Sequence, residues 1–116
     1  MVVLVKLDTN FITGWETFHT AFAETFGFPE FYGRNMDAWI DCMTYLDDPK
    51  SGMTTVHALP GGVVTLQLED VNSFAQRCPE QYEAIIECTA FVNWRRMDNT
   101  NAAPVLTLSF YKTPPR

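Results

Sequence analysis

The chain has 116 residues, of which 47% are hydrophobic and 14% aromatic, and it is expected to form a single domain over residues 1–116. A formal net charge of −6 disfavours direct nucleic-acid binding, which needs clustered Lys and Arg. It favours a basic protein partner, although a merely soluble acidic protein is equally compatible with it. The apolar runs fall far short of the roughly 18 residues of a membrane helix, and the N-terminus lacks a signal-peptide pattern. We therefore expect a cytoplasmic protein that binds no membrane.

The three cysteines, Cys42, Cys78 and Cys88, are an odd number without a C-x-x-C pair. Neither histidine lies close to them in sequence, so the short spacings of a metal knuckle are missing. We expect reduced, mostly buried thiols. The pattern predicts no metal site and no cofactor.

The first elements are a strand and a helix. Val2 to Leu7 is a short β-branched run, which is typical of a strand. The segment 13–16 fits a capping box, in which the Thr13 hydroxyl and the Glu16 carboxylate cover free amides at a helix start. The helix is expected to end near Gly27, and its apolar face is formed by Trp15, Phe18, Phe22 and Phe26.

A second helix follows a loop that contains Pro29 and Gly33. Asn35 is placed to cap this helix, which is expected to run to about Leu46. The next segment, residues 47–62, is rich in Pro and Gly and predicts an irregular connection.

The second half repeats strand and helix signals. A second strand is expected from Val63 to Leu68, and helical sequence begins at Asp70 or Ser73. Pro79 is expected to break this helix or to open a new one at its first turn. The later helical period continues to about Trp94 through Tyr82, Ile85, Ile86, Thr89 and Val92. Residues 97–104 predict a polar turn, and residues 105–110 a third strand.

The predicted order is strand, helix, helix, strand, helix, strand. Strands separated by helical crossovers favour parallel pairing. We therefore predict the α/β class, with a small three-stranded parallel sheet and helices packed on it.

The helix predicted after Asn35 has two different faces. Met36, Trp39, Ile40 and Met43 form an apolar stripe, and the opposite face carries Asp37, Asp41, Thr44, Tyr45 and Asp48. Spacing alone fits an ordinary solvated face or a docking surface for a cationic pocket. The neighbouring aromatic pair, Phe31 and Tyr32, favours docking, because aromatics beside a few charges are typical of interface centres. Either aromatic side chain is also suited to filling the gap between two helices.

The uninterrupted segment FPEFYGRNMDAWIDCMT, residues 28–44, resembles the central motif of the barstar family of intracellular ribonuclease inhibitors. The resemblance implies a barstar-like fold and a partner that is a basic ribonuclease or nuclease toxin. It also implies that the loop and the following helix enter the active site of the nuclease, where acidic side chains take the place of RNA phosphates.

By position in the motif, Asp41 matches the dominant acidic contact and Asp37 a second one, while Phe31 stands where the family usually has Tyr. Glu83 and Glu87 are candidates for a further acidic contact from the last helix. Together with the neighbouring aromatic positions, the predicted partner-binding residues are Phe31, Tyr32, Gly33, Asn35, Asp37, Asp41, Thr44 and Tyr45.

The chain departs from the family pattern at Phe31, at Ile40, where the family has Trp, and in the longer segment 47–62. These departures favour a partner other than barnase. The main prediction is a protein inhibitor, monomeric when free; the alternative is a non-inhibitory acidic interaction module with the same fold.

An enzyme is the least favoured interpretation. Asp37 and Asp41 resemble an acid/base pair that His19 or His57 would assist, but both carboxylates are expected on an exposed helix face. The sequence shows no nucleophile motif or phosphate-binding glycine pattern. His19 is expected at the surface or its boundary, and His57 is a weaker candidate for partner contact.

Overall fold

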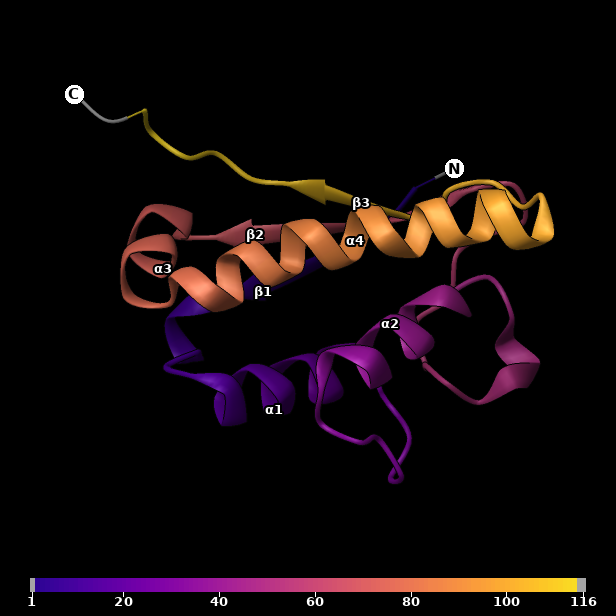
Figure 1. The fold of residues 1–116 in the computed structure, drawn as a ribbon, viewed down its shortest axis with the longest axis horizontal. Helices are drawn as coiled ribbons and strands as arrows, with labels where there is room; N and C mark the ends of the chain where they lie inside the picture. The colour runs from indigo at the N-terminus through magenta and orange to yellow at the C-terminus, as the bar shows by residue number, and fades with distance from the viewer. Residues whose placement is uncertain (1, 115–116) are drawn as a thin grey trace.

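The computed structural model describes residues 2–114, in which a three-stranded parallel sheet packs against helices (Figure 1). The strands are β1 (Val2–Asp8), β2 (Val63–Glu69) and β3 (Leu106–Ser109), in the order β1-β2-β3. Leu4 pairs with Thr65, which pairs with Thr107. The predicted class, order of elements and strand direction are confirmed.

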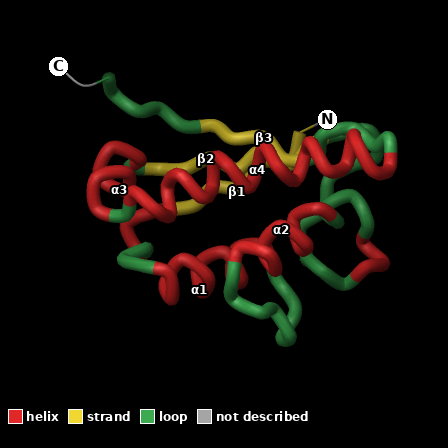
Figure 2. The backbone as a smooth tube through the Cα atoms, in the orientation of Figure 1, coloured by secondary structure: helices red, strands yellow, loops and turns green. Residues whose placement is uncertain are grey.

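The helices cover one face of the sheet. Inward-facing residues of the three strands, Leu7, Val64, Leu66, Leu68 and Leu106, are buried, whereas Val2 and Leu4 on the other face are exposed. Figure 2 shows the strands as one layer with the helices gathered beside it. The apolar runs of β1 and β2 are thus strands with one buried face, and their alternation decides which side chains enter the core.

Helix α1 (Trp15–Phe26) buries Phe18, Phe22 and Phe26 completely. Trp15, expected on the same face, is 38% exposed, because it lies in the first turn at the edge of the core. The predicted capping box is wrong. The helix starts after Gly14, so the Thr17 hydroxyl accepts the amides of Thr13 (2.8 Å) and Gly14 (3.2 Å).

The end of α1 holds the irregular segment 47–62, which includes the short 3-10 helix η2 (Pro49–Ser51). Gly27 has φ of 67°, and a Cβ at this position would clash with the Thr55 side chain, so only glycine fits. The Thr55 amide donates to the Phe26 carbonyl oxygen at 2.9 Å, and the Ala58 amide donates to the Leu46 carbonyl oxygen at 2.9 Å. The segment is irregular, as predicted, but it is tied to the ends of two helices.

Helices α3 (Val71–Arg77) and α4 (Pro79–Thr100) meet at Pro79, which opens α4 at its first turn as expected. Two details of the prediction for α4 are wrong. The helix continues to Thr100 instead of ending near Trp94, since the polar side chains there find helical partners; the Thr100 hydroxyl donates to the Arg96 carbonyl oxygen at 2.8 Å. Ile86 is exposed, and the buried face comprises Gln81, Ile85, Thr89, Val92 and Arg96.

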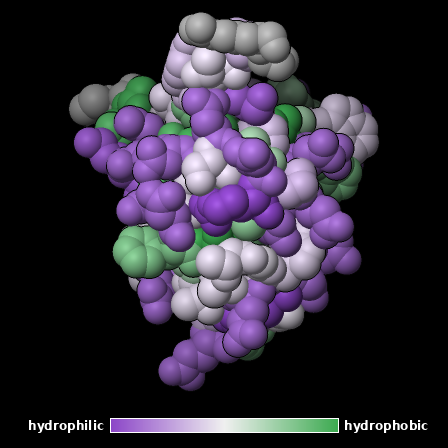
Figure 3. All heavy atoms as spheres, turned by 90° about the vertical axis from the view of Figure 1, so that its left-hand side faces the viewer, coloured by the Kyte–Doolittle hydropathy of each residue, from purple (hydrophilic) through white to green (hydrophobic). Residues whose placement is uncertain are grey.

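The cysteines are mostly buried, as expected: Cys42 and Cys78 lie in the core and Cys88 is half-buried, all three as free thiols. Within residues 2–114 no helix is long and apolar enough to cross a membrane. At the end that carries α3, hydrophilic residues dominate and apolar atoms form only separate patches (Figure 3).

Candidate functional site

Helix α2 (Met36–Thr44) carries most of the predicted partner-binding residues. Its N-cap is Asn35, whose side-chain oxygen accepts the Ala38 amide at 2.8 Å, as predicted. The helix ends at Thr44, two residues before the predicted end, although Leu46 beyond it remains fully buried. Trp39 packs edge-on against Phe22 of α1, with ring centroids 5.6 Å apart, and this contact fixes which face of α2 turns outward.

The predicted apolar stripe of α2 is only partly correct. Trp39 and Met43 are fully buried, whereas Met36 and Ile40 are half-buried at the edge of the core. Cys42, which was outside the predicted stripe, is buried instead. Burial raises the pKa of the Cys42 thiol to about 11, with a smaller contribution from the neighbouring Asp41 carboxylate.

The loop before α2 is held by Arg34, which adopts a left-handed backbone conformation with φ of 53°. Its guanidinium donates to the Glu16 carbonyl oxygen and to the Thr20 hydroxyl, both at 2.8 Å, and so ties the loop to α1. The Asn35 side-chain amide also donates to the Gly33 carbonyl oxygen at 3.3 Å. The predicted contact residues Gly33 and Asn35 therefore shape the junction between loop and helix.

The aromatic pair of this loop divides between surface and core. Phe31 is 76% exposed, whereas Tyr32 is 9% exposed and its hydroxyl lies 2.6 Å from Nδ1 of His19. Tyr32, predicted to bind the partner, thus fills the gap between helices with its side chain. His19 is buried, so its expected surface position is wrong; the Tyr32 hydroxyl supplies the polar partner that lets it enter the core.

Burial explains the titration behaviour of this pair. Loss of solvation lowers the pKa of His19, and the positive charge of Arg34 lowers it further. Burial raises the pKa of Tyr32 above its ordinary value, with a further contribution from Cys42. His57, the other histidine, is half-buried in the segment 47–62.

The acidic face, which we define as Asp37, Asp41 and Glu87, spans α2 and α4. All three residues are exposed. Burial raises the pKa of the half-buried Cys88 thiol, and the negative charges of Glu87 and Asp37 raise it further. Glu83 and Glu87, the two glutamates considered for a contact from the last helix, are both exposed.

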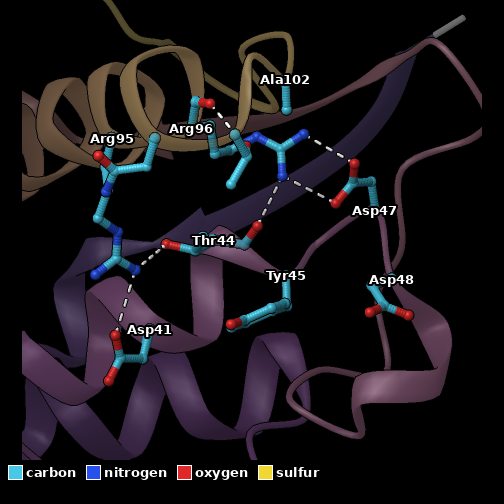
Figure 4. Close-up of a pocket in the computed structure, with 10 residues that line it drawn as sticks. Asp41, Thr44, Tyr45, Asp47, Asp48, Arg95, Arg96 and Ala102 are labelled. Carbon is cyan, nitrogen blue, oxygen red and sulfur yellow. Dashed lines mark hydrogen bonds and ion pairs between the residues drawn. The ribbon is translucent and has the colours of Figure 1, made fainter.

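Asp41 has a partner within the chain. Nη2 of Arg95, on α4, lies 3.3 Å from Oδ1 of Asp41 and donates to the Thr44 hydroxyl at 2.6 Å (Figure 4). The Thr44 hydroxyl in turn donates to the Ile40 carbonyl oxygen at 2.6 Å. Thr44 therefore links the two helices as well as lying beside the acidic face.

A second ion pair, between Arg96 and Asp47, lies at the C-terminal end of α2. Arg96 donates to both carboxylate oxygens of Asp47, at 2.9 and 2.8 Å, and to the carbonyl oxygens of Thr44 and Ala103, each at 2.9 Å. The hydrogen bond from Arg96 is the main reason that the pKa of Asp47 is lowered. Sequence reasoning missed both arginines; the only available signal was two adjacent cationic residues in an acidic chain.

Between the ends of α2 and α4 lies an open groove of about 550 Å³, which the side chains labelled in Figure 4 line. Tyr45 and Asp48 line it on the α2 side, together with the two ion pairs. Its mixed charges suit polar and charged side chains of another protein. Among residues 2–114 no group of three or more His, Cys, Asp or Glu side chains is placed to hold a metal ion.

The family model described as "Barstar (barnase inhibitor)" matches residues 2–106. The matched region runs from β1 to the first residue of β3 and includes the acidic face and both arginines. No curated protein matches the sequence.

Proposed function

Because this match extends over most of its length, the chain belongs to the barstar family, and we propose that it inhibits a basic ribonuclease. The loop at residues 28–35 and the exposed side of α2 would enter the active site of the nuclease and exclude RNA. We expect the free protein to be a monomer that acts in the cytoplasm. Phe31, Asp37, Asp41, Thr44 and Tyr45 are the proposed contact residues.

The observation that carries this proposal is the position of Asp41. Its side chain is 55% exposed, and only Oδ1 has a partner among residues 2–114. Oδ2 is thus free to accept hydrogen bonds from cationic groups that ordinarily hold a phosphate. Such charge-assisted bonds are short and strong in a dry pocket. Asp37, one turn earlier, adds a second negative charge and speeds encounter with a basic partner.

Phe31 supports the same surface. The Phe31 ring is 76% exposed in the loop that precedes α2, and a partner that covers it would remove this apolar surface from water, which is favourable. Interfaces often concentrate their binding energy in such an aromatic residue close to a few desolvated charges. Phe31 has no hydroxyl, so we expect it to contact the nuclease by packing alone.

The test is the variant Asp41→Ala, assayed against the ribonuclease that the protein captures from its native cell. We expect inhibition of RNA cleavage to be lost, because the central carboxylate is gone. The free energy of unfolding should change by less than about 1 kcal/mol, the usual value of an exposed ion pair. Glu24→Ala, which removes an exposed carboxylate from α1, is the matched control and should inhibit normally.

Full inhibition by Asp41→Ala would contradict the role of Asp41. Tight capture of a nuclease whose RNA cleavage continues unchanged would favour the alternative, a non-inhibitory interaction module that uses the same acidic face.

A further inference from the structure

The proposed binding surface contains a positive charge at its centre. Arg95 reaches over from α4, and Nη2 donates to the Thr44 hydroxyl at 2.6 Å and approaches Asp41 Oδ1 to 3.3 Å (Figure 4). On its other side the guanidinium carbon lies 5.9 Å from the centroid of the Phe91 ring. Phe91 is itself tilted against Trp94, with centroids 5.8 Å apart. Arg95 is thus held in place by the Phe91 ring, the Thr44 hydroxyl and the Asp41 carboxylate.

This guanidinium remains available to a partner. The side chain of Arg95 is 27% exposed and that of Asp41 is 55% exposed. In contrast, the side chain of the neighbouring Arg96 is 9% exposed and its donors are used within the fold. A ribonuclease that reaches Asp41 therefore meets Arg95 but not Arg96.

Binding changes the surroundings of Arg95 in two ways. A cationic group that binds Oδ2 of Asp41 comes close to a guanidinium of the same charge, and like charges at short range oppose association. The interface also removes water from Arg95, while the Asp41 carboxylate that Arg95 contacts now binds the cationic group of the nuclease as well. A buried charge that loses part of its compensation is strongly unfavourable unless another acceptor is supplied.

We propose that Arg95 determines which ribonuclease this chain accepts. The surface formed by the acidic face and Arg95 fits an enzyme that carries an acidic side chain beside its cationic active site, and disfavours one without such a group at that place. The acidic side chain would bind Arg95 while the cationic groups bind Asp41 and Asp37. This inference rests on the proposed function and extends it to the charge pattern of the partner.

The test uses barnase, the ribonuclease that the family description names. Inhibition constants are measured for the unchanged protein and for Arg95→Gln, Arg95→Lys and Lys112→Gln. We expect Arg95→Gln to change the inhibition constant for barnase on the order of tenfold, because the charge beside Asp41 is removed: inhibition tightens if barnase presents no acidic side chain at that place and weakens if it presents one. Arg95→Lys keeps the charge and should resemble the unchanged protein. Lys112→Gln removes one positive charge from the C-terminal segment near α3, and should change inhibition by no more than about twofold.

A second comparison tests whether Arg95 acts through Asp41. Asp41→Asn and the double variant Asp41→Asn/Arg95→Gln should inhibit barnase equally poorly, so that the effect of Arg95→Gln on the inhibition constant disappears. Melting temperatures of all variants confirm that each is folded.

Three results would overturn the role of Arg95: no change in the inhibition constant of Arg95→Gln, including no inhibition by either protein; an equal change in Lys112→Gln; or a change that persists without Asp41. None of them bears on the native ribonuclease, for which Asp41→Ala is the test. Failure of Arg95 as the specificity residue is therefore distinguishable from failure of the proposed function.

Discussion

Arg95 and Arg96 are neighbours on α4, yet they hold two regions of the molecule in different ways. Arg96 binds both oxygens of Asp47 and the carbonyl oxygens of Thr44 and Ala103, and its side chain is 9% exposed. Arg95 makes one contact of 3.3 Å with Asp41, on the exposed side of α2. One pair joins the end of α2 to the turn before β3, and the other lies on the proposed binding surface.

The difference shows how burial separates stability from recognition. Removing one member of a bidentate pair that also bonds carbonyl groups lowers stability more, because partly buried acceptors are left without donors. An exposed pair with a single contact contributes little to folding, since water replaces it at small cost. A partner that excludes water can therefore use Asp41 without unfolding the chain.

The largest effect is expected for Arg96→Ala. Removing this guanidinium leaves the carbonyl oxygens of Thr44 and Ala103 without their donor, and we expect the free energy of unfolding to fall by about 2 kcal/mol. Urea denaturation measures it. Arg95→Ala is the matched control and should cost less than about 1 kcal/mol. Similar losses of unfolding free energy in Arg96→Ala and Arg95→Ala would contradict this difference between the two arginines.

The aromatic pair before α2, Phe31 and Tyr32, also consists of one exposed and one buried residue. Tyr32→Phe removes the hydroxyl that bonds His19, so we expect a loss of about 1 kcal/mol in unfolding free energy, with inhibition unchanged. Phe31→Ala should show the reverse, weaker inhibition with little change in stability, because its ring is exposed. Denaturation and inhibition measured on both variants test this; weaker inhibition by Tyr32→Phe would place the hydroxyl in the interface.

The smallest effect is expected from pH. Burial and Arg34 lower the pKa of His19 in the folded protein below its ordinary 6.5, so the unfolded chain binds the proton more readily. The stability that neutral His19 contributes is present above pH 6.5 and is lost as the pH falls below that value. Unfolding free energies measured across this range should decline on acidification, and less steeply in His19→Gln. An equal decline in both proteins would assign the effect to other groups.

Local signals in the sequence were sufficient for much of the fold. The strand β2, the cap at Asn35 and the helix start at Pro79 depend on a few neighbouring residues, and each was predicted correctly. The start of α1 and the end of α4 were not, because helix ends depend on which side chains find partners. The Thr17 hydroxyl meets the Thr13 amide because the helix starts one residue later than predicted. Arg96 meets Asp47 through the packing of α4 against the end of α2.

The candidate surface shows the same limit. The spacing of Asp37 and Asp41 predicted that they share the outward face of α2, and both are exposed. The spacing did not predict that Tyr32 turns inward to His19, which lies 13 positions away in the chain. The Tyr32 side chain therefore packs inside the fold, and its contact with a partner stays a prediction, as does that of the exposed Phe31.

The sequence by itself determined the order of elements, the parallel sheet, the family and the acidic side of α2, because these follow from periodicity and from a continuous motif. Only the tertiary structure decided that Arg95 and Arg96, more than 45 positions away in the chain, meet Asp41 and Asp47. Adjacent residues on a helix point in different directions, so one arginine enters the core and the other reaches the surface. Which carboxylate each one meets depends on how α2 and α4 pack against the sheet.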